Sequence, residues 1–177
     1  LMEAMPPTWV PEPVIVDQVL AVLSRVGTLE SAQKCYEILG KHPSSSRLRF
    51  STVLEAFVEA AKYEKDVERR EAIVKNAIAA LNDRWNVDVN LPRHRVERIN
   101  LCSIVLHCMS VAGISSSPEM CDEADQLMKR ALGGTSYHVL KGRISSKQGR
   151  VDAQALHLVH FLVQIYASSG EELRLEG

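Results

Sequence analysis

Apolar residues recur along this chain at spacings of three and four, which is the pattern of amphipathic helices. A typical stretch places Val74, Ala77, Ile78, Leu81 and Trp85 on one face. Similar stretches begin near residues 17, 28, 47, 96, 118 and 152, with a shorter one at 137–144. Strict alternation of apolar and polar residues, the signal for strands, is scarce. The pattern therefore predicts an all-α chain of about seven to eight helices.

Residues that cap or break helices set the expected boundaries. Gly27 follows the first apolar face and is suited to a left-handed C-terminal cap. Thr28 can cap the next helix, which Gly40 is expected to stop. The charged stretch 62–70 is expected to extend a turn, and residues 86–92 are expected to form a loop.

Four segments align on an aliphatic pair followed eight positions later by a small residue. They are residues 19–27, 53–61, 105–113 and 162–170. Successive offsets are 34, 52 and 57 residues, and the first is the length of a helix-turn-helix repeat. A lone helix pair cannot bury its apolar face, so neighbouring pairs stack into one core. We expect a right-handed α-solenoid rather than an irregular bundle, with units at 17–46, 47–92, 93–150 and 151–170, an extended arm at 1–16 and a tail at 171–177.

These segments resemble the pentatricopeptide repeat family and, more distantly, the tetratricopeptide family. The resemblance is carried by VGTLESAQKCYEIL at 26–39, FSTVLEAFVEAA at 50–61, CSIVLHCMSVAG at 102–113 and CDEADQLMKRAL at 121–132. It covers roughly residues 17–132, and the inserted loops depart from the regular family pattern. It implies a stacked solenoid that binds single-stranded RNA in a mitochondrion or plastid, in RNA processing or translation, without a cofactor.

The resemblance also implies which side chains would read RNA bases. Such repeats read one base each through two or three side chains. In this family the main position lies two residues before the aliphatic pair, which here selects Asp17, Ser51, Ser103 and His160. The plainer interpretation is that these are short polar residues on an exposed helix face.

Charge provides an independent test of RNA binding. The chain has 21 basic and 22 acidic side chains and a net charge of −1, whereas RNA affinity needs positive charge. That balance hides a local excess of +6 between residues 125 and 152. The candidate phosphate contacts are Arg93, Arg95, Arg98, Lys129, Arg130, Lys141, Arg143, Lys147 and Arg150. The alternatives are a solvated basic loop or one that docks on an acidic protein surface.

Other kinds of site have little support in the sequence. The four cysteines fall in apolar helical patterns without a C-x-x-C pair, so we expect buried, reduced thiols. His157 and His160 share a helix face, yet no third metal ligand is evident, and packing is the favoured interpretation. No nucleotide-binding or metalloprotease motif occurs, so we expect neither an enzyme nor a metal. No apolar run reaches the roughly 20 residues needed to span a membrane, so no insertion is expected.

Two functions therefore remain open at the level of sequence. The first is an RNA-binding segment of an intracellular, organellar protein. The second is a protein-interaction scaffold that reads no bases, within a larger complex such as a ribonucleoprotein. A continuous positive stripe beside Ser51 and Ser103 would favour RNA, and an apolar or mixed groove would favour a protein partner.

Overall fold

The computed structural model describes residues 12–42, 47–88, 95–113, 118–131, 158–161, 163–165 and 167. Every regular element in these residues is a helix, which confirms the all-α prediction. The helices are α1 (Pro13–Leu23), α2 (Leu29–Lys41), α3 (Arg47–Tyr63), α4 (Val67–Asp88), α5 (Arg95–Ala112) and α6 (Pro118–Ala131). A further helical stretch lies within residues 158–167.

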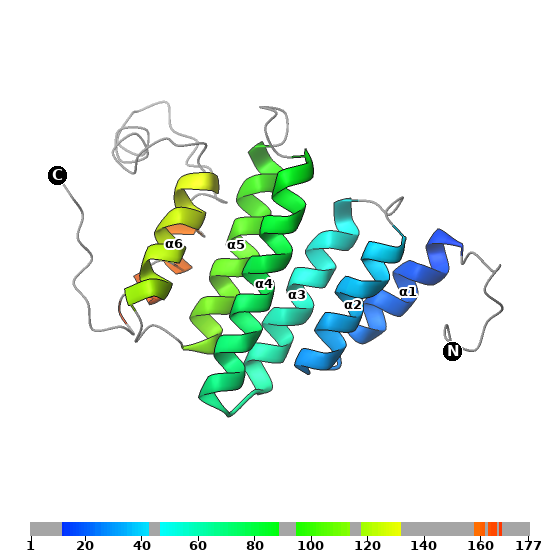
Figure 1. Cartoon of the computed structure of the whole chain (residues 1–177), viewed down its shortest axis with the longest axis horizontal. Coiled ribbons are helices and arrows are strands. Elements are labelled where there is room, and N and C mark those ends of the chain that lie inside the picture. Colours follow the sequence, from blue (N-terminus) through cyan, green and yellow to red (C-terminus); the bar gives the residue numbers. More distant parts are fainter. Residues whose placement is uncertain are drawn as a thin grey trace.

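The described helices stand side by side in sequence order, and consecutive ones run in opposite directions (Figure 1). Each helix packs against the next, and in addition α1 packs on α3, α3 on α5, and α2 on α4. Helices α1, α3 and α5 therefore form one layer, which is called the odd layer below. Helices α2, α4 and α6 pack against one side of this layer. Among the described helices, none that stand more than two apart in order are in contact.

The aliphatic pairs that define the sequence repeat anchor the odd layer. The second member of each pair is Leu20 in α1, Leu54 in α3 and Leu106 in α5, and each is at most 1% exposed. Phe57 adds the largest fully buried side chain of α3. Full burial of a leucine or phenylalanine contributes about 1.5–3 kcal/mol, so the aligned positions are also the main sources of stability.

Two helix starts show why the chain turns where it does. The amide of Ser31 donates to Thr28 Oγ1 at 3.1 Å, and the Thr28 amide donates to Ser31 Oγ at 3.3 Å. This capping box confirms Thr28 as the cap of α2. Before α4, Asp66 Oδ1 accepts from the Arg69 amide at 2.9 Å and satisfies one of the unpaired amides of the first turn.

Glycine is required after α1 and after α5. Gly27 has φ of 72° and Gly113 has φ of 62°, the left-handed region that side chains with a Cβ disfavour. A Cβ at Gly27 would also lie 2.7 Å from Cδ2 of Tyr63, at the end of α3. The glycine thus lets the α1–α2 turn approach α3, as expected from the small residue that ends the repeat segment.

The structure moves four of the expected boundaries. Helix α1 begins at Pro13, inside the segment expected to be an extended arm, because proline at the first position is compatible with a helix. Helix α2 passes through Gly40 to Lys41. Residues 64–66 alone separate α3 from α4, since the Asp66 cap draws the charged residues after it into the first turn. Helix α4 then continues to Asp88, into the expected loop.

The expected repeat units correspond to helix pairs where the structure describes them. The pairs α3–α4 and α5–α6 lie within units 47–92 and 93–150, whereas the pair α1–α2 begins at Pro13, four residues before unit 17–46. The short helix expected at 137–144 and the tail at 171–177 lie outside the described residues.

Candidate functional site

Three of the four candidate base-reading residues lie on the helices of the odd layer, and the fourth lies on the helical stretch that packs on α5. Asp17 in α1 is exposed, and Ser51 in α3 and Ser103 in α5 are half-buried. His160 is exposed in the helical stretch 158–161, which packs on α5. The sequence alignment therefore places them on neighbouring helices of the odd layer and its C-terminal continuation.

The charges beside Ser51 are mixed. Glu55 and Glu59 follow it at intervals of four residues and so share its face of α3. Lys62 is exposed on the same helix, and its ammonium group donates to the carboxylate of Glu59. Among the side chains of α3 that the structure describes, two carboxylates with one cation that is already paired form a mixed surface, the kind expected to favour a protein partner over RNA.

Two contacts hold the C-terminal helical stretch on α5. The ring of Phe161 stacks on His107 with centroids 4.8 Å apart and an interplanar angle of 17°. The Ser110 hydroxyl donates to Gln164 Oε1 at 2.8 Å. Burial lowers the pKa of His107, nearby Lys62 lowers it further, and Glu59 opposes both. The imidazole is therefore neutral at physiological pH and acts as a stacking surface.

Two of the predicted phosphate-binding arginines, one on α5 and one on α6, lie near Cys102. Burial raises the pKa of the Cys102 thiol to about 12, and the charges of Arg130 and Arg98 act in the opposite direction, so both guanidinium groups lie near it. The Arg130 guanidinium also donates to Asn82 Oδ1 of α4. Lys129 is exposed one position earlier. These cations make a local positive edge at the α6 end of the described helices.

The remaining basic candidates are not placed by the structure. The backbone of Arg95 begins α5, but its side chain lies outside what is described. The others outside the described residues are Arg93, Lys141, Arg143, Lys147 and Arg150.

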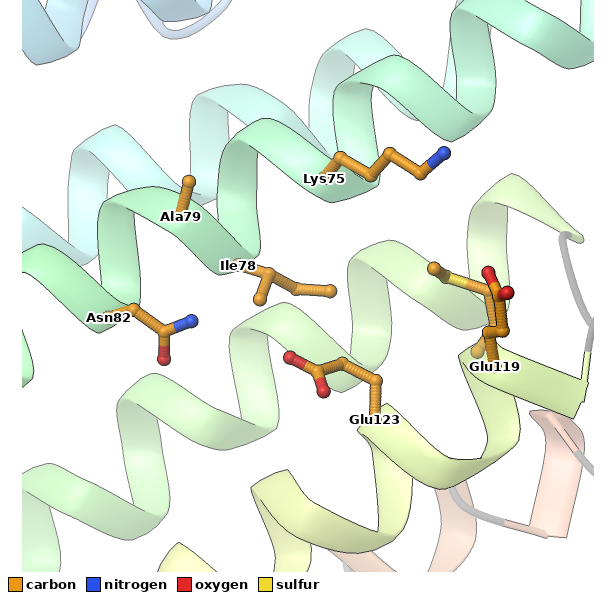
Figure 2. Close-up of a pocket in the computed structure, with 7 residues that line it drawn as sticks. Lys75, Ile78, Ala79, Asn82, Glu119 and Glu123 are labelled. Carbon is orange, nitrogen blue, oxygen red and sulfur yellow. The ribbon is translucent and has the colours of Figure 1, made fainter.

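A groove separates α4 from α6, and no sequence signal singled it out. Its volume is about 310 Å³, at the low end of the roughly 300–1,000 Å³ typical of ligand pockets. Ile78 and Met120 are at most 9% exposed and form its floor. Figure 2 shows Ile78 and the carboxylate of Glu123 pointing into the space between the two helices. The α4–α6 groove is completed by Lys75, Ala79, Asn82 and Glu119.

The rim of the α4–α6 groove is acidic. Lys75 is paired within α4 to the carboxylate of Glu71, at 3.6 Å. Within the described residues, Glu119 and Glu123 have no hydrogen bond or ion pair, and both stand beside the apolar floor. The groove therefore offers two unpaired carboxylates next to Ile78 and Met120, whereas the single cation on its rim is already neutralised.

The groove arises from the spacing of the even-numbered helices. Helix α2 packs directly on α4, joined by the Tyr36 hydroxyl donating to Asp83 Oδ2 at 2.7 Å. Helix α6 reaches α4 through the longer side chain of Arg130. The residues Lys75, Ile78, Ala79 and Asn82 recur at steps of three, one and three, so they share one side of α4, at the edge of its buried face. That spacing identifies a face, and the opening beside it depends on the position of α6.

The structure confirms that the cysteines are buried thiols: Cys35, Cys102, Cys108 and Cys121 are at most 3% exposed. Among the described residues no cluster of three or more histidine, cysteine or acidic side chains could hold a metal ion. His157, the proposed companion of His160, lies outside them. Nor does any described helix combine the length and apolarity needed to cross a bilayer.

Comparison with known proteins provides no relative from which a function could be inferred. The chain matches no protein-family model, no curated protein and no solved structure.

Proposed function

We propose that this chain is a protein-interaction module built from stacked helix-turn-helix repeats, in which the α4–α6 groove binds a segment of a partner protein. The segment carries aliphatic residues for the floor and lysine or arginine for the rim. The observation that carries the proposal is the pair of carboxylates, Glu119 and Glu123, which have no partner among the described residues and stand beside the apolar side chains of Ile78 and Met120.

Contacts between neighbouring helices support the repeat part of the proposal. Each described helix packs on the next in order, and α1–α3, α2–α4 and α3–α5 add next-but-one contacts, a pattern of neighbour contacts that is compatible with a solenoid. The repeats are taken to wind as a right-handed α-solenoid like that of pentatricopeptide and tetratricopeptide proteins. Such stacks present long surfaces to extended or helical ligands.

The magnitudes fit a partner held by several weak contacts. Each exposed ion pair with Glu119 or Glu123 would contribute about 0.2–1 kcal/mol. Burial of apolar surface on Ile78 and Met120 would add about 25 cal/mol per Å². Because Ile78 and Met120 are at most 9% exposed, the apolar surface left to bury there adds only about 1 kcal/mol or less, so the floor aids binding while charge sets the preference for a basic segment.

Peptide display against the purified chain tests this proposal. Enriched peptides are expected to combine lysine or arginine with leucine, isoleucine or methionine. They should bind the double variant Glu119→Lys, Glu123→Lys about tenfold more weakly, the loss of roughly two surface ion pairs. The matched control is Glu30→Lys, Glu37→Lys, on the exposed surface of α2. Peptides without basic residues, or equal binding to the groove variant, would exclude the groove.

A specific observation favours the second candidate function, binding of single-stranded RNA in an organelle. Arg98 and Arg130 both lie near Cys102, and Lys129 is exposed one position before Arg130. Fluorescence anisotropy with a labelled single-stranded oligouridine tests it. RNA binding would weaken steeply with salt and would fall in the variant Lys129→Glu, while Lys34→Glu on α2 would leave it unchanged. RNA binding that is absent, or that does not weaken with salt, would exclude this second function and leave protein interaction as the remaining candidate.

A further inference from the structure

Helix α1 leaves a stripe of aliphatic side chains uncovered. Ile15, Val19, Val22 and Val26 follow one another at steps of four, three and four residues, so they share one side of the helix and the turn after it. Ile15 is 36% exposed, Val22 67% and Val26 54%, and Val19 is half-buried. These residues are called the α1 stripe below.

The same positions are covered in the other helices of the odd layer. With the repeat offset of 34 residues, Val19, Val22 and Val26 correspond to Val53, Ala56 and Ala60 of α3. All three of these counterparts are at most 1% exposed.

Helix α5 repeats the comparison at an offset of 86 residues. The four counterparts of the stripe are Leu101, Val105, Cys108 and Ala112, none more than 4% exposed. The exposure of the α1 stripe therefore reflects the position of α1 in the stack, because side chains at the same place in α3 and α5 are buried.

The elements that bury the α3 counterpart are known. Helix α3 packs on both α1 and α2, the preceding helix pair. The turn of that pair meets the end of α3, where Gly27 lies against Tyr63, on the Ala56 and Ala60 side of α3. Helix α5 is packed in turn by α3 and α4. Each odd helix after the first is thus covered on this side by the preceding pair.

We propose that the α1 stripe is a docking surface for a helix-turn-helix unit of another polypeptide, which stacks on α1 as the pair α1–α2 stacks on α3. The surface continues an interface that the fold already forms twice.

This surface lies on α1, apart from the α4–α6 groove, so the inference goes beyond the proposed function and can fail independently of it. A tandem chain tests whether the stripe accepts such a unit. A second copy of residues 13–46 is inserted after Ser46, giving the order α1, α2, α1, α2, α3. Since Pro13 and Arg47 are one repeat length apart, the new junction copies the natural one.

The readout is the reactivity of a single new thiol, because the four natural cysteines are buried. Val22→Cys is placed in the original chain and in the second α1 copy of the tandem chain. The Val22→Cys thiol should react with a disulfide reagent at least about tenfold more slowly in the tandem chain than in the original chain, since reaction there requires local opening. Ala21→Cys is the control, because Ala21 is exposed and its counterpart Glu55 is exposed too.

The melting temperature supplies a second measurement. The tandem chain should melt above the original, because an added repeat contributes a further interface. Equal Val22→Cys rates in the two chains, or a tandem chain that melts below the original, would overturn the proposal.

Measurements on the original chain would detect two other occupants of the α1 stripe. If a second copy covers the stripe, sedimentation will show a dimer that Val22→Glu dissociates and Ala21→Glu does not. If residues 1–11 cover it, deleting them will raise the Val22→Cys rate to that of Ala21→Cys. Either result would replace the proposed occupant, whereas a monomer whose Val22→Cys thiol reacts freely agrees with it.

Discussion

Replacing Gly27 with alanine is expected to destabilise the chain by about 2 kcal/mol. Its φ of 72° lies in the left-handed region, which costs a residue with a Cβ about 1–2 kcal/mol. The added Cβ would also lie 2.7 Å from Cδ2 of Tyr63. Tyr63 is 68% exposed, so its ring can move aside, at a cost of about 0.5–1.5 kcal/mol if it leaves its rotamer.

Two other glycines separate these contributions. At Gly113, φ is 62° but the nearest atom to a Cβ would be Arg70 Nη1 at 3.6 Å, so Gly113→Ala should show the backbone cost alone. Gly40 lies inside α2 with nothing within 4 Å of a Cβ. Gly40→Ala should therefore stabilise the chain by about 0.5–1 kcal/mol.

Thermal unfolding followed by far-UV circular dichroism measures the series. With about 2–4 °C for each kcal/mol in a chain of this size, Gly27→Ala should lower the midpoint by about 4–8 °C and Gly40→Ala should raise it. Adding Tyr63→Ala to Gly27→Ala should cost less than the two single effects combined, because the ring no longer obstructs the Cβ. A Gly27→Ala midpoint equal to or above the original would refute the reasoning.

Three further outcomes are expected. Thr28→Ala should lower the free energy of unfolding, measured in urea, by about 1 kcal/mol, because the Ser31 amide loses its capping oxygen. Thr28→Ser should keep most of that stability, because it retains the capping hydroxyl. Leu106→Ala should cost about 2–5 kcal/mol, since the leucine is fully buried; a loss below 1 kcal/mol would contradict its place in the core. Burial raises the pKa of Cys102 and Cys108 to about 12, so both stay protonated in the fold above the pH at which unfolded thiols ionise. The stability that the two buried thiols contribute is complete below about pH 8.5 and is lost as pH rises toward 12. Replacing both with alanine should therefore make the free energy of unfolding, measured in urea, depend less on pH across that range.

The sequence predicted the helices where side-chain periodicity and local signals agree. The spacing of the aliphatic pairs located Leu20, Leu54 and Leu106 in the core, and Thr28 identified the start of α2 through its own hydrogen bond. These predictions succeed because each depends on residues close together in the chain.

Boundaries failed where one residue was given too much weight. Gly40 was expected to end α2, yet a glycine in a helix costs only about 1 kcal/mol, which the flanking turns outweigh. The charged residues after Lys62 were expected to form a turn, but charged side chains are good helix formers once Asp66 caps the first amides. Charge density alone does not separate a loop from an exposed helix.

The candidate site depended on distances that the sequence does not contain. Ile78 was predicted to face inward, and the opening beside it exists because α6 does not reach the backbone of α4. Arg98 and Arg130 are far apart in the chain and lie near the same thiol, Cys102, only through the packing of α5 on α6. Relations between helices far apart in the chain are fixed by packing, which periodicity does not specify.

Helices in the middle of the described stack have more neighbours than those at its ends, so the helices are expected to differ in local stability. Helix α3 packs on α1, α2, α4 and α5, whereas α1 packs only on α2 and α3 among the described helices, and α6 packs on α5 and reaches α4 through the Arg130 side chain. Local opening from either end therefore sacrifices few contacts, and amide hydrogens of the outer helices exchange with solvent long before those of α3. The middle of the stack retains its structure while the ends open and close, so a ligand that binds at an end gains part of its effect by suppressing that opening.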